Sequence, residues 1–149
     1  MGYKVIVSNK PEDRQLSFTI RRTVFIEEQQ VPAEMEIDGH DYEGETRYVL
    51  AFDANGAAVG TARFRPYSDG IVKVERVAVL AGERGGGVGC ALMLAVAKEA
   101  KAAGYITIKL SAQLHARLFY EKLGFAAKGP VYLDAGIEHV DMFKMLEEN

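Results

Sequence analysis

Hydrophobic and polar residues alternate along this chain with two periods, one typical of strands and one typical of helices. Residues 3–7 form a short, mostly apolar run that predicts a strand. Leu16, Ile20 and Val24 then recur near helical spacing, and they predict a helix over about residues 10–28. The chain therefore opens with a strand followed by a helix.

Local turn and cap signals indicate where elements begin. Asn9 followed three residues later by Glu12 has the spacing of a capping box, so we expect it to start the first helix. Asn55-Gly56 is a strong hairpin signal between two strands predicted at 47–53 and 58–66.

The second half of the chain continues the alternation of strands and helices. A third strand, predicted at 71–80, leads through a glycine-rich loop into a helix that ends near Ala103, with Gly104 suited to the position after it. The remaining predicted elements are a strand at 106–111, a helix at 115–122 and strands near 125–133 and 138–146. This order predicts an α+β (mixed α/β) domain with a central mixed, mostly antiparallel sheet.

Composition narrows the class of protein. The 149 residues are enough for one domain, 1–149, and the hydrophobic share of 48% is that of a globular protein. The formal charge of −3 argues against nucleic acid as the main partner. A single cysteine argues against a disulfide framework, and we expect no metal. The longest apolar run, 88–97, is too short to cross a membrane, and the first residues show no signal peptide, so we expect a cytoplasmic protein.

The segment 31–46 carries an unusual excess of negative charge. It holds six acidic residues and no lysine or arginine. Its field favours a cationic or amine-bearing ligand, although an exposed acidic loop would show the same pattern.

The glycine-rich loop 82–89 has the features of an anion site, because glycines and a following helix N-terminus present backbone N–H groups. It is not a Walker loop, since Val88-Gly89 stands where Lys-Ser/Thr is required. It is not a dinucleotide fingerprint either, since Cys90 replaces the third glycine.

Two motifs resemble the GNAT superfamily of N-acetyltransferases. Arg84-x-x-Gly87-x-Gly89 is similar to the loop that binds the acetyl-CoA pyrophosphate, and residues 118–125 are similar to the F-Y-x-x-x-G-F element of the family. Positions within 21–38 and 133–139 resemble the small bacterial branch typified by ElaA and YjcF. The resemblance implies a GNAT-like sheet flanked by helices on both faces, acetyl-CoA as co-substrate, and direct attack of a small-molecule amine on the thioester.

The resemblance also implies roles for individual residues. Tyr120 corresponds to the general acid, and a phenol with an ordinary pKa of about 10 stays protonated at neutral pH. Glu75 interrupts an apolar strand, so it either has a raised pKa and acts as base or pairs with Arg63 or Arg65. His139 is the other candidate base, unless it is simply an exposed strand residue. The residues expected to bind acetyl-CoA are Val77, Ala78, Val79, Arg84, Gly85, Gly86, Gly87, Val88, Gly89 and Gln113.

The acceptor is less well specified by the sequence. Four arginines could clamp a carboxylate or phosphate of the substrate: Arg21, Arg22, Arg63 and Arg65. Together with the acidic segment they favour a small zwitterion or an amino-sugar phosphate.

Two other activities are compatible with the same sequence features. One is a noncatalytic acyl-CoA-binding or sensing domain, and the other is an enzyme like the acyl-homoserine-lactone synthases. The sheet edges make a homodimer plausible.

Overall fold

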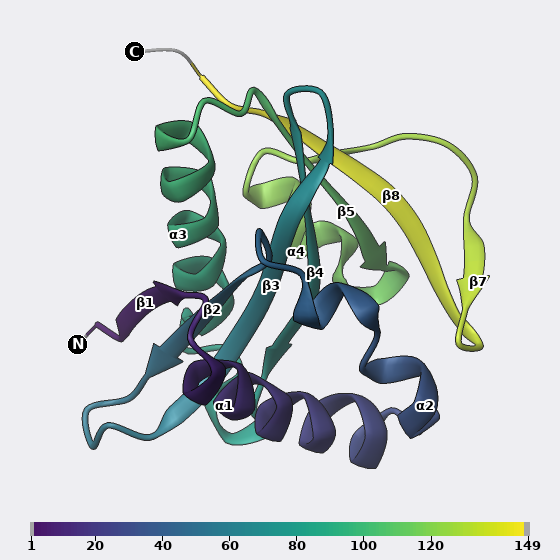
Figure 1. Ribbon diagram of the computed structural model, residues 1–149. Coiled ribbons are helices and arrows are strands. Elements are labelled where there is room, and N and C mark those ends of the chain that lie inside the picture. The colour runs from purple at the N-terminus through teal and green to yellow at the C-terminus, as the bar shows by residue number, and fades with distance from the viewer. Residues whose placement is uncertain (1, 148–149) are drawn as a thin grey trace.

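The computed structural model describes residues 2–147, and within them eight strands form one sheet (Figure 1). The strands are β1 (Lys4–Ser8), β2 (Arg47–Phe52), β3 (Ala58–Ser68), β4 (Ile71–Val79), β5 (Thr107–Gln113), β6 (Ala126–Ala127), β7 (Tyr132–Asp134) and β8 (Ile137–Met145). Their order in the sheet is β1-β2-β3-β4-β5-β8-β6, and β7 also pairs with β8. Among these pairs β4 and β5 run parallel, whereas the others are antiparallel.

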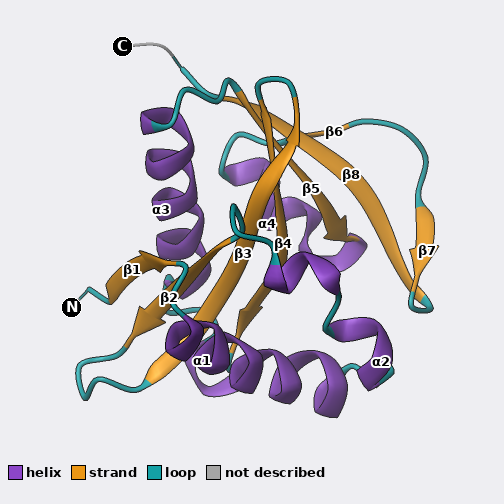
Figure 2. Ribbon diagram, in the orientation of Figure 1, coloured by secondary structure: helices purple, strands orange, loops and turns teal. Residues whose placement is uncertain are grey.

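Helices lie on both faces of the sheet (Figure 2). They are α1 (Pro11–Arg21), its π-helical continuation η1 (Arg22–Glu28), α2 (Ala33–Glu36), α3 (Val88–Ala102) and α4 (Arg117–Lys122), with 3₁₀ turns η2 (Gly39–Tyr42), η3 (Ala81–Glu83) and η4 (Leu114–Ala116). The predicted mixed α/β fold with a mostly antiparallel sheet between helices is confirmed. No helix within residues 2–147 is long and apolar enough to cross a membrane.

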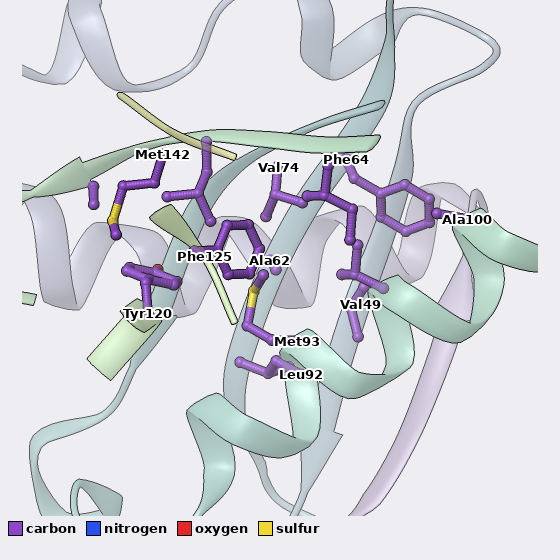
Figure 3. Packing of buried hydrophobic residues seen from close by; sticks show 14 of the residues in the cluster. Val49, Ala62, Phe64, Val74, Leu92, Met93, Ala100, Tyr120, Phe125 and Met142 are labelled. Atoms are coloured by element: carbon purple, nitrogen blue, oxygen red, sulfur yellow. The ribbon is translucent and has the colours of Figure 1, made fainter. Parts of the chain in front are cut away.

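Two apolar clusters hold the layers together. Leu92 and Met93 of α3 pack against the sheet, and Tyr120 of α4 lies beside Phe125 at the other end of the same cluster (Figure 3). On the opposite face, Ile20 and residues of η1 pack on Leu50 and neighbouring strand residues. Of the three residues whose spacing predicted this helix, Ile20 and Val24 face the sheet, whereas Leu16 is 40% exposed.

The start of the first helix differs from the prediction. Lys10 is the N-cap of α1, and no side chain caps the helix, so the capping box expected at Asn9 is wrong. Ser8 instead donates its hydroxyl to the Asp13 carboxylate at 2.6 Å, and its Oγ accepts from the Lys10 backbone N–H at 3.1 Å. Ser8 therefore organises this turn, and Pro11, whose fixed φ suits a first helical turn, begins the helix.

The strand predicted near 125–133 is also wrong, because it is broken into β6 and β7. Gly129 has a φ of +90°, and Pro130 follows it. Proline has no backbone N–H to donate to a neighbouring strand, so continuous pairing stops between the two short strands. β7 instead forms a hairpin with β8, in which Tyr132 pairs with His139.

Candidate active site

The central feature of the site is a separation of β4 from β5. Their pairing ends at Val74 and Leu110, and beyond this point the two strands diverge. At the same place β4 contains a bulge, in which Arg76 has a φ of +59° and the register with β3 shifts. A cavity of about 690 Å³ lies here, and its wall includes Val77, Ala78 and Val79.

One end of the cavity is formed by the N-terminus of α3. Gly87 is its N-cap with a φ of +93°, and the first backbone bond of the helix runs from the Ala91 N–H to the Gly87 carbonyl. The preceding N–H groups, those of Val88, Gly89 and Cys90, have no acceptor within the helix and no side-chain cap. These free donors and the positive end of the helix dipole suit an anion such as a phosphate.

The glycines of this loop have different surroundings. Gly85, Gly87 and Gly89 line the cavity, together with Val88. Gly86 is not among the lining residues, and a Cβ at this position would lie 2.8 Å from the Tyr3 hydroxyl. Its small size therefore allows the loop to pack on β1.

Two side-chain links connect the end of η1 with both sides of the cavity. Arg84 donates from Nε to the Val79 carbonyl at 2.9 Å and forms an ion pair with Glu28. Gln113, at the end of β5, exchanges two amide hydrogen bonds with Gln29, of 2.8 and 3.1 Å. All of these residues except Glu28 line the cavity, and the pairing role of Gln29 was not foreseen from the sequence.

Tyr120 reaches the cavity from α4. Its side chain is 7% exposed, and its ring contacts Phe119 and Phe125 edge-to-face with centroids 5.0 and 5.8 Å away. Burial raises the pKa of the Tyr120 hydroxyl above its usual value. The phenol therefore stays protonated throughout the neutral range and can act as a hydrogen-bond donor.

His139 lies on the cavity wall at the start of β8. Its Nδ1 is 2.7 Å from the Ile137 carbonyl, which assigns the proton of a neutral ring to Nδ1 and leaves Nε2 free to accept. The ring stacks on Tyr132 with centroids 6.0 Å apart. Tyr132 in turn is fixed by its hydroxyl, which lies 2.6 Å from the Asp141 carboxylate and 2.7 Å from Ser111 Oγ.

Glu75 also lines the cavity, but its pKa is not raised as it would be in a base that acts near neutral pH. Its carboxylate accepts from Arg63 Nη2 at 2.8 Å and from Arg65 Nε at 2.7 Å. Burial would raise the pKa of Glu75, but the Arg65 hydrogen bond and the Arg63 charge outweigh it and lower the pKa to about 2. The expectation of a raised pKa is wrong, and the alternative, an ion pair with both arginines, is what the structure contains.

The four arginines expected to clamp a substrate occupy other positions. Arg21 is fully buried and bonds to the carboxylates of Glu36 and Asp41, while Arg63, equally buried, bonds to Asp38 and approaches Asp41 at 3.0 Å. None of the four arginines predicted to clamp the substrate lines the cavity: Arg21, Arg22, Arg63 and Arg65. We therefore correct the clamp prediction for these two residues: Arg21 joins α1 to α2 and η2, and Arg63 of β3 joins η2 to the sheet.

The same contacts revise the interpretation of the acidic segment. Glu36 and Asp38 also bind Arg76, at 2.9 and 3.3 Å. Burial alone would raise the pKa of Asp41, but the hydrogen bonds and the charge of Arg21 outweigh it and lower this pKa strongly. Half of the six acids are thus neutralised internally. Arg76 was not singled out in the sequence, since nothing in an apolar strand pattern marks a bulge.

Comparisons with known proteins place these features in a family. The family model described as "Acetyltransferase (GNAT) domain" matches residues 8–146. The chain belongs to the GNAT acetyltransferases. The Bacillus subtilis protein YjcF, an uncharacterised N-acetyltransferase, is 38% identical over 142 residues, covering 95% of this chain and 99% of YjcF.

Solved GNAT relatives share the architecture almost completely. The crystal structure of Escherichia coli ElaA is 28% identical with a TM-score of 0.84, covering 95% of this chain and 99% of ElaA. The crystal structure of an acyl-CoA N-acyltransferase from Pseudomonas aeruginosa is 27% identical with a TM-score of 0.85, covering 96% and 99%. The predicted membership of the GNAT superfamily and similarity to the ElaA and YjcF branch are therefore confirmed.

Proposed function

We propose that this GNAT protein transfers the acetyl group of acetyl-CoA to a primary amine of a small molecule, by direct attack within a ternary complex. The observation that carries the proposal is the cavity between the diverging strands β4 and β5. It has an uncapped helix N-terminus at one end and the side chains of Tyr120 and His139 on its walls. Acetyl-CoA supplies an activated acyl group as a thioester.

The donor side follows from the backbone donors of the cavity. The free N–H groups at the start of α3 and the guanidinium of Arg84 bind the pyrophosphate in this proposal. The exposed backbone of β4 beyond the separation, residues 77–79, bonds to the amides of the pantetheine arm, and Gln113 assists from β5. The Val77 N–H stabilises the oxyanion that forms on the thioester carbonyl.

The acceptor side requires a base, because an alkylammonium has a pKa of about 10.4 and must lose a proton before it attacks. His139 takes this proton at Nε2. The amine nitrogen then forms a bond to the carbonyl carbon, and the carbon–sulfur bond breaks as the oxyanion collapses. Tyr120 donates its proton to the departing thiolate, and the second proton of the attacking nitrogen then restores the Tyr120 phenol, so that a neutral amide and a free thiol result. His139 releases its proton to solvent, and Glu75 stays ionised as part of the wall.

The first experiment separates an enzyme from a noncatalytic acyl-CoA-binding domain. We expect calorimetry to show micromolar binding of acetyl-CoA, none of ATP, and loss of binding in Gly87→Arg. Thiol release with a panel of primary amines then measures turnover. Acetyl-CoA binding without turnover of any amine would favour the sensing domain, and absence of binding would refute the proposal.

The roles of the two side chains have distinct signatures. Tyr120→Phe should lower kcat by about 100-fold while leaving acetyl-CoA affinity unchanged, since only the donated proton is removed. His139→Gln should lower kcat/KM by about 100-fold, because it removes the group that accepts the proton of the amine. A kcat/KM within a few-fold of the parent value in His139→Gln would show that another group is the base.

Two further expectations belong to the proposal. The first is that the protein acts in the cytoplasm, as expected from its sequence. The homodimer expected from the sheet edges stays a prediction, and light scattering coupled to gel filtration measures it directly.

A further inference from the structure

Three cationic residues lie side by side across the middle of the sheet. Arg65 of β3 is the direct register partner of Lys73 of β4, and Lys73 is the register partner of Lys109 of β5. We call these three residues the cationic row. Direct partners on adjacent strands point to the same face, and like charges in this arrangement repel each other. A row of three positive charges therefore weakens the sheet unless anions compensate it.

The protein compensates the cationic row only in part. Glu75 lies 2.7 Å from Arg65 and 3.4 Å from Lys73, and it is also one of three carboxylates around the buried Arg63, with Asp38 and Asp41. On the other side, Asp141 is 3.9 Å from Lys109, at the limit of an ion pair. The row thus retains an excess of positive charge, although its side chains are only 13%, 20% and 15% exposed.

The aromatic ring of Tyr67 lies close to both lysines of the row. Lys109 Nζ donates to the Tyr67 hydroxyl at 3.0 Å and lies 4.4 Å from the ring centroid, while Lys73 Nζ lies 5.6 Å from the same centroid. The ring attracts both ammonium groups without neutralising either. Tyr67 itself is 45% exposed, and each member of the row beside it keeps some exposed surface.

The row lies at the edge of the proposed active site. Lys73 lines the cavity, as do Glu75 and Ser111, while Arg65 and Lys109 adjoin Lys73 on the neighbouring strands, outside the cavity wall. Figure 1 shows that the turn between β3 and β4 extends well beyond α1, so this end of the sheet face is not under that helix. The row therefore continues the acceptor wall that begins at His139.

We propose that the acceptor amine carries an anionic group, a carboxylate or a phosphate, and that Arg65, Lys73 and Lys109 bind this group. Partly buried cations in excess over their carboxylate partners form a strong site for an oxyanion. The inference rests on the proposed acetyl transfer, for which it specifies the acceptor. It also replaces the arginine clamp expected from the sequence, since Arg65 alone of those four arginines belongs to the row.

The test compares amines that differ in the anionic group. Binding of 2-aminoethyl phosphate, β-alanine and ethanolamine is measured by calorimetry, with the protein alone and with desulfo-CoA present. We expect one or both anionic amines to bind at least about tenfold more tightly than ethanolamine. The ratio between them identifies phosphate or carboxylate as the group. Equal binding of all three, or no binding of any, would overturn the proposal.

A pair of variants with the same charge change locates the site. Lys109→Gln removes one member of the row, while Lys98→Gln removes an exposed lysine from α3 on the other face. Lys109→Gln should lose most of the preference and keep or slightly raise its Tm, because repulsion within the row is relieved. Lys98→Gln should keep the preference. A preference that survives in Lys109→Gln, or a Tm that falls by several degrees with unchanged binding, would show that the row is structural.

The outcomes separate this inference from the proposed function. Binding of acetyl-CoA is measured in the same samples and does not involve the row. Acetyl-CoA binding and turnover without a preference for anionic amines would overturn only the inference. A preference for anionic amines without acetyl-CoA binding would overturn the proposed function and leave the anion site.

Discussion

The bulge of β4 predicts that glycine at position 76 gives a more stable protein than alanine does, the reverse of the order in an ordinary strand. Arg76 holds a φ of +59°, a left-handed conformation that costs a residue with a Cβ about 1–2 kcal/mol and costs glycine almost nothing. Its side chain bonds to the Glu36 carboxylate at 2.9 Å, so any truncation loses this contact. Arg76→Ala and Arg76→Gly lose the same contact, and the difference between them isolates the backbone.

We expect Arg76→Gly to be more stable than Arg76→Ala by about 1 kcal/mol. In an ordinary strand the order is reversed, and glycine is less stable than alanine by about 0.5–1 kcal/mol. Arg47 of β2 provides the control, since it is absent from the residues with positive φ. Urea denaturation of both pairs gives the free energies of unfolding. If Arg76→Ala proved as stable as Arg76→Gly, the left-handed conformation of this residue would be refuted.

Two further predictions concern buried charge. Arg21→Met should lower the free energy of unfolding by about 3–5 kcal/mol, because it leaves Glu36 and Asp41 buried beside an apolar side chain. The exposed neighbour Arg22, changed to Met, should shift the urea midpoint little, and equal losses at both positions would contradict the assignment. The second prediction is that Glu75, with a folded-state pKa of about 2 against an ordinary 4.5, contributes stability that is present above pH 4.5 and lost as the pH falls toward 2. Glu75→Gln should flatten the dependence of Tm on pH in this window, and an unchanged slope would count against the lowered pKa.

Local signals in the sequence were sufficient for most elements of the fold. The hairpin at Asn55-Gly56 and the end of α3 at Gly104, which has a φ of +92°, depend on residues within a few positions of each other. The glycine loop before α3 was equally evident, because its donors come from one continuous stretch of chain. Features of this kind are determined by the residues that form them, without a partner elsewhere in the chain.

Features that depend on distant partners were not accessible in the same way. Residues 71–79 look like an uninterrupted strand, and the bulge at Arg76 exists only through the register with β3 and the carboxylates of α2. The sequence shows that Arg21 is basic but not that Glu36 and Asp41 enclose it. A count of charges does not show where they lie, which is why the sequence assigned the buried Arg21 and Arg63 to a substrate clamp.

The ion pair between Glu28 and Arg84 has a consequence for the thermodynamics of donor binding. A phosphate that approaches Arg84 competes with a carboxylate already bound there, so binding exchanges one ion pair for another. If acetyl-CoA binds at Arg84 as proposed, its affinity is therefore a difference between two electrostatic terms and understates the strength of the phosphate contact. Glu28→Gln would then tighten donor binding. It would also release the end of η1 from the glycine-rich loop. Of the two side-chain links across the cavity, the Gln29–Gln113 pair would then be left.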